Sequence, residues 1–264
     1  MREAAYLLRA MAAIYAESAR SALMVLRRNW IILPASLALL IVWLVTLLIL
    51  NEFGMVGAFM LGIIQIALIS TYYAWISAAV DREKLTIPSM LKFDVGLFFS
   101  LIGVAFILSI ADILFKQPFQ NSLEYAWVPA CAGLVVFILF NAVPEVVHHH
   151  RYDSLPSLAS AFQFNKENWI EWYLPLVILI IPSIIVDWRA TLVLVASTDV
   201  LLPISFLVKA LNTALPSPYI DLGYLLRQIP ILIAGTWFMF FRAYLFRELE
   251  HGTRRRRIYL MKNR

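Results

Sequence analysis

Long apolar runs dominate this chain and predict membrane-spanning helices. Residues 31–50 form a run of 20 positions and residues 54–80 a run of 27, and neither contains Asp, Glu, Lys or Arg. A helix needs roughly 20 residues to cross the hydrocarbon of a bilayer, where backbone groups must be hydrogen-bonded internally. Further apolar runs, each with one charged residue, cover residues 95–115, 127–147, 169–186 and 229–246. The pattern therefore predicts an all-α polytopic membrane protein with six transmembrane helices.

The apolar runs come in pairs, and the order of elements recurs about every 70 residues. The sequence Ile-Pro-Ser-Met-Leu at residues 87–91 returns 68 positions later as Leu-Pro-Ser-Leu-Ala at residues 155–159. A period of this length is typical of one structural unit that is used several times. We therefore predict a single membrane domain of three repeated hairpins. Its parts are repeat 1 (1–80), repeat 2 (81–147), repeat 3 (148–246) and a basic cytoplasmic tail (247–264).

A basic amphipathic stretch precedes the first hairpin. Its arginines recur at helical spacing on one face, and Leu8, Ile14, Tyr15, Val25 and Leu26 lie away from them. Residues 154–162 repeat this pattern before the third hairpin. We therefore predict an interfacial amphipathic helix ahead of each hairpin.

Residues 190–211 are the ambiguous part of the chain. They are apolar enough to suggest a further span, but Asp199 and Pro203 interrupt the run and Lys209 ends it. A seventh crossing would also place the two ends of the chain on opposite sides of the membrane. The segment is therefore expected to lie on the membrane, to re-enter it, or to extend the fifth helix.

Composition supports a membrane class and limits the chemistry. Hydrophobic residues make up 62% of the chain and charged residues 15%, which is more apolar surface than a water-soluble core buries. Cys131 is the one cysteine, so a disulfide or a cysteine-based metal cage within one chain is excluded.

Basic residues gather before the first span and after the last one. Lys and Arg are retained on the cytoplasmic side of a membrane, so both ends of the chain are predicted to be cytoplasmic. Such clusters also attract anionic phospholipids, with about 1 kcal/mol for each residue near the surface. The candidate lipid contacts are Arg9, Arg20, Arg27, Arg28, Arg254, Arg255, Arg256 and Arg257. Topology anchoring and docking of an acidic partner are the alternatives, and no nucleic-acid role is expected.

Three short matches indicate a family. They are Arg-Asn-Trp at residues 28–30, Ser-Leu-Ala-Ser-Ala-Phe at 157–162 and Phe-Arg-Ala-Tyr-Leu-Phe at 241–246. In these matches and in the order of elements the chain resembles the bacterial YciC-like membrane proteins. The wider group includes the membrane domain that accompanies some glycerophosphodiester phosphodiesterases. The resemblance implies a six-helix protein of the bacterial inner membrane without an assigned reaction. It does not bring a phosphodiesterase activity, because the catalytic domain has no counterpart in this sequence.

Charged residues at membrane depth are the candidate functional groups. Glu145 and Arg242 both lie near the cytoplasmic ends of their predicted spans, so we expect them to form a structural charge pair. Glu145 also stands three and four residues before His148 and His149, a spacing that presents a carboxylate and an imidazole to one metal ion, and His251 is expected on the same side. The alternatives are histidines in a hydrated interface and a response to pH.

Catalytic motifs are otherwise absent from the sequence, which has no Gly-rich phosphate loop, Gly-x-Ser-x-Gly or His-Glu-x-x-His. We therefore expect a non-catalytic integral membrane protein without a cofactor, a scaffold or subunit of a membrane complex with a membrane protein as its partner. Two alternatives stay open. One is a carrier or channel for a small or lipidic solute, and the other is a membrane enzyme that uses Glu145 and the His148–His150 cluster.

Overall fold

The computed structural model describes residues 2–116, 127–150, 153–186, 199–203 and 222–250, together with residues 191, 195 and 205. Throughout these residues the protein is all-α and has no strand. The helices are α1 (Arg2–Arg28), α2 (Ile32–Leu50), the 3-10 turn η1 (Asn51–Phe53), α3 (Gly54–Val80), α4 (Ile87–Met90), α5 (Val95–Lys116), α6 (Trp127–Phe140), α7 (Val143–His150), α8 (Ser154–Val186) and α11 (Leu222–Glu250).

Four stretches of the described chain are long and apolar enough to cross a membrane by length and composition, which suggests a multi-pass membrane protein. They are Ile32–Val80, Ile87–Leu114, Trp127–His150 and Ile229–Glu250. The first of them holds two helices, α2 and α3, that fold back on each other. The run at residues 169–186, in the second half of α8, is not one of these stretches.

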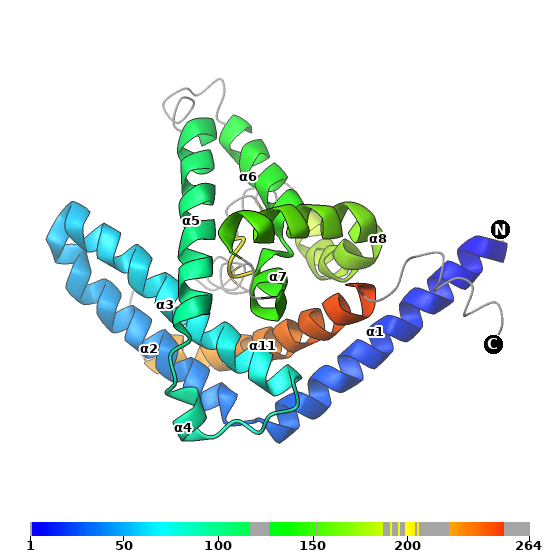
Figure 1. Ribbon diagram of the computed structural model, residues 1–264, viewed down its shortest axis with the longest axis horizontal. Helices are drawn as coiled ribbons and strands as arrows, with labels where there is room; N and C mark the ends of the chain where they lie inside the picture. Colours follow the sequence, from blue (N-terminus) through cyan, green and yellow to red (C-terminus); the bar gives the residue numbers. More distant parts are fainter. Residues whose placement is uncertain are drawn as a thin grey trace.

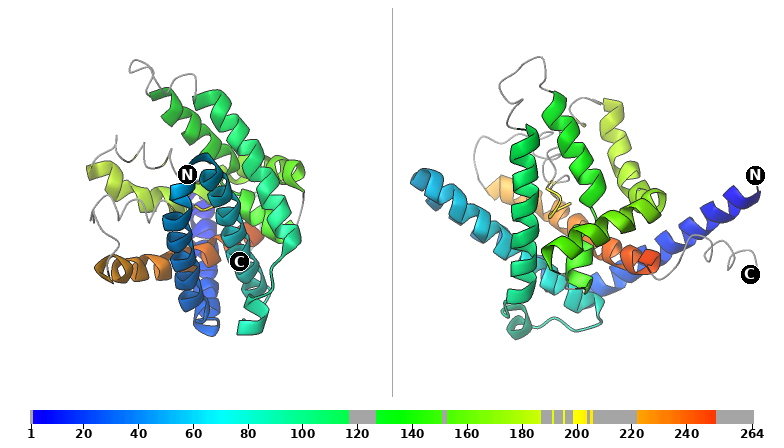
Figure 2. Two further views of the ribbon diagram at one scale, coloured as in Figure 1. Left: turned by 90° about the vertical axis from the view of Figure 1, so that its left-hand side faces the viewer. Right: turned by 45° about the horizontal axis from the view of Figure 1, so that its top comes forward.

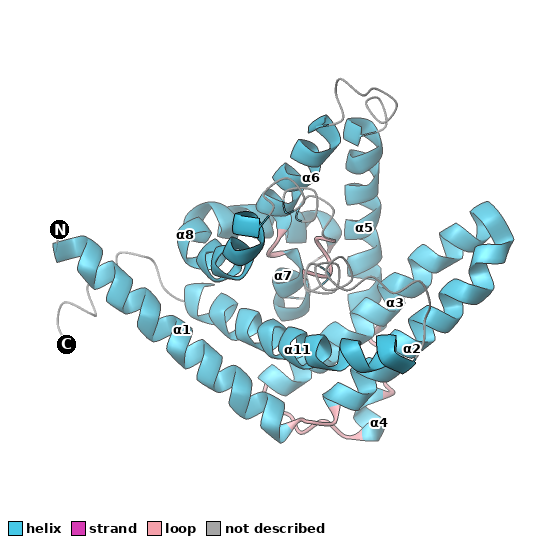
Figure 3. Ribbon diagram, turned by 180° about the vertical axis from the view of Figure 1, so that it is seen from behind, coloured by secondary structure: helices cyan, strands magenta, loops and turns pink. Residues whose placement is uncertain are grey.

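The helices are arranged around a centre formed by α3, α7 and α11 (Figure 1). α5 and α6 lie side by side and project from this centre (Figure 2). α1 and α11 pack along each other in opposite directions, and α11 crosses α2 and α3 (Figure 3). Large side chains that are fully buried mark the core, among them Tyr73, Ile76, Leu101 and Phe240.

The turn between α2 and α3 depends on two glycines. Gly54 has a φ of +55°, a backbone conformation that side chains disfavour. Gly57 is buried near the start of α3, and a Cβ there would lie 1.9 Å from the backbone oxygen of Leu50. The two helices can therefore approach closely only because this position has no side chain.

The apolar face of α1 is covered by protein. Met11, Val25 and Leu26 are buried, and α11 is the helix that packs most extensively along α1. Tyr15 lies against Phe241 of α11, and its hydroxyl donates to the backbone oxygen of Glu171 at 2.7 Å. The sequence pattern alone assigned this face to the membrane interface. Met11, Val25 and Leu26 pack against protein instead, whereas Leu8 is 63% exposed and its contact with the membrane stays a prediction.

The amphipathic helices expected before the second and third hairpins differ from the first. The second is reduced to α4, four residues that begin with a capping box between Thr86 and Ser89. The third is the first half of α8, which continues into the second half through a kink at Asn168, where φ is −120° and ψ is 21°. Within the described residues the three amphipathic elements therefore differ in length and form.

The predicted span at residues 127–147 is not one helix. A turn at Asn141 and Ala142 separates α6 from α7, and Pro144 lies in the first turn of α7. Proline fits there because its missing N–H would have had no partner in the first turn. Residues 141–148 are all buried, so the break lies inside the protein.

Two predictions fall outside the described residues. His251 and Arg254 to Arg257 follow the described part of α11. Of the ambiguous segment at residues 190–211, only residues 191, 195, 199–203 and 205 are described.

Candidate functional site

A buried ion pair joins α7 to α11. Arg242 donates from Nε to Glu145 Oε1 at 2.6 Å and from Nη2 to Glu145 Oε2 at 2.9 Å. The same guanidinium donates from Nη1 to the side-chain oxygen of Asn141 and from Nη2 to its backbone oxygen, both at 2.7 Å. The side chains of Arg242 and Glu145 are only 4% and 1% exposed. The structure thus brings together the two residues that the sequence suggested as a charge pair, and adds Asn141.

Aromatic rings enclose the guanidinium of Arg242. Its Cζ lies 4.5 Å from the centre of the Trp172 ring, within the range of a cation–π contact. Trp172 in turn packs edge-on against Phe164, and Phe164 packs on Phe246. The charge pair therefore lies in a site that excludes water, where its hydrogen bonds are stronger than at a surface.

Side chains of α8 donate hydrogen bonds to the last backbone oxygens of α6, where the helix breaks. Asn165 Nδ2 donates to the backbone oxygens of Ile138 and Leu139, at 3.3 and 2.8 Å. The hydroxyl of Tyr173 also donates to the oxygen of Ile138. A broken helix survives at membrane depth only where neighbours replace the lost backbone hydrogen bonds. Asn165, Tyr173 and Arg242 do so here, so these carbonyls are occupied by protein groups.

The three histidines of α7 contact two different partners, Tyr73 and Glu250. The buried ring of His148 stacks on Tyr73, with ring centres 5.7 Å apart. His149 lies with its Nε2 3.5 Å from Glu250, and His150 contacts the same carboxylate. These contacts tie the end of α7 to the end of α11.

The metal site considered from the sequence does not assemble. Both carboxylate oxygens of Glu145 bind Arg242, while His148 and His149 turn toward Tyr73 and Glu250. The proposed fourth ligand, His251, lies outside the described residues. Within the described part of the chain, no group of three or more His, Cys, Asp or Glu side chains is placed to hold a metal. The helical spacing was correct, but the charge pair takes the carboxylate away from the imidazoles.

A cavity of about 450 Å³, here called the polar cavity, lies between α3, α5, α6 and the segment at residues 199–201. Its polar side chains come from three of these elements: Gln65, Ser109, Asp112 and Asp199. The remaining wall is apolar and includes Ile69 and Val136. A polar cavity among helices this apolar is the kind of site that holds a solute or water.

Asp199 is held in place by several hydrogen bonds. Gln65 Nε2 donates to Asp199 Oδ2 at 3.2 Å, and the backbone N–H of Leu201 donates to Asp199 Oδ1 at 2.8 Å. The hydroxyl of Tyr73 donates to the backbone oxygen of Leu201 at 2.9 Å. The segment at residues 199–203 is therefore fixed to α3 at two points, through Gln65 and Tyr73.

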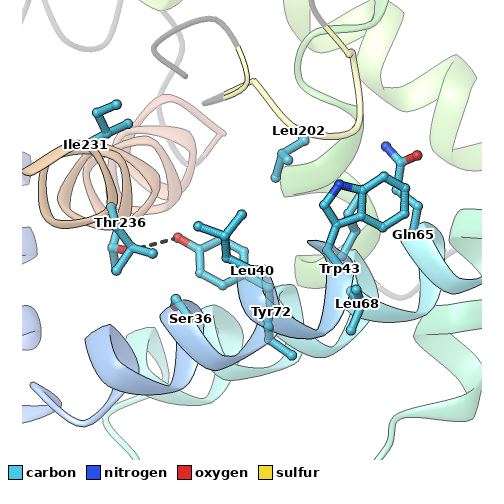
Figure 4. Close-up of a pocket in the computed structure, with 12 residues that line it drawn as sticks. Ser36, Leu40, Trp43, Gln65, Leu68, Tyr72, Leu202, Ile231 and Thr236 are labelled. Carbon is cyan, nitrogen blue, oxygen red and sulfur yellow. Dashed lines mark hydrogen bonds between the residues drawn. The ribbon is translucent and has the colours of Figure 1, made fainter. Parts of the chain in front are cut away.

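A second cavity, here called the apolar pocket, lies on the other side of Gln65 (Figure 4). It has a volume of about 250 Å³ between α2, α3, α11 and Leu202. Trp43 and Leu40 face into it, and Tyr72 points across it to Thr236, with 3.3 Å between the two hydroxyl oxygens. Gln65 and Ile69 line both cavities, so α3 separates one from the other.

The candidate lipid contacts on α1 have the exposure that such a role requires. Arg9, Arg20, Arg27 and Arg28 are all exposed. Arg28 also donates from Nη2 to the backbone oxygen of Ala79 at 3.1 Å, which fixes the end of α1 to the end of α3. Contact of these residues with lipid stays a prediction.

The sequence pattern missed Gln65 as a functional residue. It pointed to Asp199 only as an interruption, and to no common site for Asp199, Asp112 and Gln65. A signal was present, because Gln65 is the one side-chain amide in the 27 residues of α3. What the sequence lacked was the placement of residue 199, which is 134 positions from Gln65.

Comparisons with protein-family models, with curated proteins and with solved structures find no match to this chain. The resemblance to the YciC-like membrane proteins therefore stays a prediction.

Proposed function

We propose that this protein is a multi-pass membrane carrier that binds a small polar solute in the polar cavity. The observation that carries the proposal is the cavity itself, about 450 Å³ in volume and lined by Gln65, Ser109, Asp112 and Asp199. Ionisable side chains at membrane depth are costly, and where they line a cavity they mark a substrate or ion path. The volume is in the range of small-molecule sites.

The surrounding architecture divides into a fixed part and a part with fewer polar ties. Arg242, Asn165 and Tyr173 hold α6, α7, α8 and α11 together. Near the cavity the α2–α3 hairpin is held by single hydrogen bonds, from Gln65 to Asp199, from Tyr72 to Thr236 and from Tyr73 to Leu201. At the other end of α3, Ser77 donates to the backbone oxygen of His148, and Arg247 binds Val80 and Asp81, so this end is the pivot of the proposed motion. A carrier needs one group of helices to rock against another, and this hairpin is the group we propose to move.

The finer architecture belongs to the same proposal. Six membrane helices in three hairpins, with both ends of the chain on the cytoplasmic side of a bacterial inner membrane, would agree with the basic residues of α1 and the tail. A non-catalytic role agrees with the engagement of Glu145 by Arg242, which removes that carboxylate from acid–base work.

Accessibility of the cavity to water-soluble reagents tests the carrier. Cys131→Ala yields a chain without cysteine, because Cys131 is the one cysteine. Ser109→Cys in that background places a thiol in the cavity wall, and Ile110→Cys, one residue along α5 and outside the cavity lining, is the matched control. The probe is a membrane-impermeant methanethiosulfonate, added to right-side-out and to inside-out vesicles.

The carrier predicts reaction of the Ser109→Cys thiol from both sides of the membrane, because the cavity opens alternately to each. The Ile110→Cys thiol should stay unreactive from either side, since its surroundings are lipid. Reaction from one side alone, or from neither, would rule the carrier out.

A scaffold is the second candidate, and the frame around Arg242 favours it. The strongest polar groups of the bundle are used to hold helices together, which suits a protein whose shape must not change. A scaffold predicts an unreactive Ser109→Cys thiol together with a stoichiometric partner polypeptide in native mass spectrometry of gently solubilised membranes. Absence of any such partner would reject it.

A further inference from the structure

A third hollow, here called the lipid groove, runs along the outer side of the α2–α3 hairpin. It has a volume of about 520 Å³, and its lining is almost entirely apolar. α2 contributes Pro34, Ala38 and Val42 at a spacing of four residues, so they form one stripe along the helix. Proline and alanine are small, which leaves a channel where longer side chains would fill the space.

The length of the groove fits one membrane leaflet. Its α2 wall extends from Ile31 to Val42, which is about 16 Å at 1.5 Å per residue. The hydrocarbon core of a bilayer is roughly 30 Å thick, so one leaflet measures about half of that. A single extended acyl chain would therefore fill the groove from end to end.

The second wall of the groove is α4, and it is firmly built. The indole N–H of Trp75 donates to the backbone oxygen of Met90 at 2.9 Å. The backbone N–H of Leu85, just before α4, donates to the side-chain oxygen of Asn29 at 2.9 Å. These bonds fix the backbone around α4. Ile87 and Leu91 line the groove and are 64% and 80% exposed. Fixed apolar side chains of this exposure favour an apolar occupant.

The mouth of the groove is basic. Lys92 is exposed and lines it, directly after Leu91. Arg27 and Arg28 end α1 a few residues before Ile31. Trp30, directly before Ile31, is exposed, as is typical of an aromatic residue at headgroup depth. The nearest acidic group along the chain, Asp94, accepts a hydrogen bond from the backbone N–H of Leu97 at 3.0 Å and caps α5.

We propose that the lipid groove holds one acyl chain of an anionic phospholipid from the bilayer, with its phosphate at Lys92. The apolar walls select a hydrocarbon chain, the length selects one that spans a leaflet, and the charge at the mouth selects a negative headgroup. This site is distinct from the polar cavity, with which it shares no lining residue. It stands independently of the proposed carrier.

The test uses the full-length protein in nanodiscs of mixed phosphatidylglycerol and phosphatidylcholine, followed by native mass spectrometry. The wild type should retain one phosphatidylglycerol per chain. Lys92→Gln should lower this retention about fivefold, the equivalent of roughly 1 kcal/mol for one basic residue at a membrane surface. Lys84→Gln is the matched control, because Lys84 is exposed but lies outside the groove lining.

A second variant tests the acyl chain without altering charge. Ala38→Trp should fill the groove and abolish retention, whereas Ala58→Trp, at an exposed alanine of α3 outside the groove, should leave it unchanged. Equal retention by Lys92→Gln and the wild type, equal retention of both lipids, or an unchanged Ala38→Trp would each overturn the proposal. So would a partner polypeptide that occupies the groove in place of lipid.

Discussion

Arg242 of α11 and Glu145 of α7 stand 97 residues apart in the chain and meet in a two-point contact, with N to O distances of 2.6 and 2.9 Å. The same guanidinium reaches the turn at Asn141 that separates α6 from α7. One arginine therefore serves both as the partner of a buried carboxylate and as the cap of a broken helix.

Removal of the carboxylate should be strongly destabilising. Glu145→Ala leaves the guanidinium of Arg242 buried and uncompensated, which costs about 3 to 5 kcal/mol. The free energy of unfolding in mixed micelles would measure the loss. The double variant Glu145→Ala with Arg242→Leu should recover part of it, because no unpaired charge remains. A loss in the double variant equal to the sum of the losses in Glu145→Ala and Arg242→Leu would show that the charge pair is not coupled.

The contact between α8 and the end of α6 should matter almost as much. Asn165→Ala leaves the carbonyls of Ile138 and Leu139 without this donor, at a cost of about 1 to 3 kcal/mol. Gln163→Ala is the control, since Gln163 is exposed and donates to Glu167 on the helix surface. It should change the unfolding free energy by no more than about 0.5 kcal/mol. A similar effect of both variants would argue against a special role for Asn165.

The glycines of α3 should respond in opposite directions. Gly57→Ala brings a Cβ within 1.9 Å of the backbone oxygen of Leu50, so the hairpin must shift, at about 1 to 3 kcal/mol. At Gly62 a Cβ meets nothing within 4 Å. Gly62→Ala should therefore be neutral, or stabilise by up to about 1 kcal/mol through helix propensity. Thermal unfolding of the two variants compares them directly, and a stable Gly57→Ala would contradict the close approach.

Gln65 should control access to the polar cavity. Gln65→Leu removes the hydrogen bond to Asp199 and makes the wall shared with the apolar pocket less polar. Reaction of the Ser109→Cys thiol with a charged methanethiosulfonate should slow. The charged reagent enters the cavity in hydrated form, and a less polar wall disfavours water there. Gln163→Leu, on the exposed surface of α8, serves as the control and should leave the rate unchanged. An unchanged rate in Gln65→Leu would place the reagent path elsewhere.

Some of the site could be read from residue spacing and some could not. Glu145 and Arg242 could be suggested as partners because each is the single charge in its apolar run, and an unpaired charge in hydrocarbon is costly. The metal site suggested by the histidines was wrong because Arg242 binds the carboxylate of Glu145. Their spacing from Glu145 is compatible with a metal, but spacing along one helix says nothing about a competing cation on another.

The break between α6 and α7 shows the limit of reading hydropathy alone. Residues 127–147 are apolar throughout except Asn141 and Glu145, so a sliding average sees one span. The helix stops at Asn141 because Asn165, Tyr173 and Arg242 replace its backbone hydrogen bonds from other helices. Those donors are distant in the sequence, so no pattern within residues 127–147 predicts them.

By itself the sequence determined the class of the protein and the extent of most helices, as in α2, α3 and α5. Hydropathy and backbone hydrogen bonding act locally, so each run carries its own signal. The tertiary structure decided which polar groups meet: Arg242 with Glu145, Gln65 with Asp199, and Tyr15 with Glu171. It also decided that α1 covers α11. These outcomes depend on how helices pack across 90 or more residues of intervening chain, and such packing is set by the shapes of whole helix faces rather than by the spacing within one.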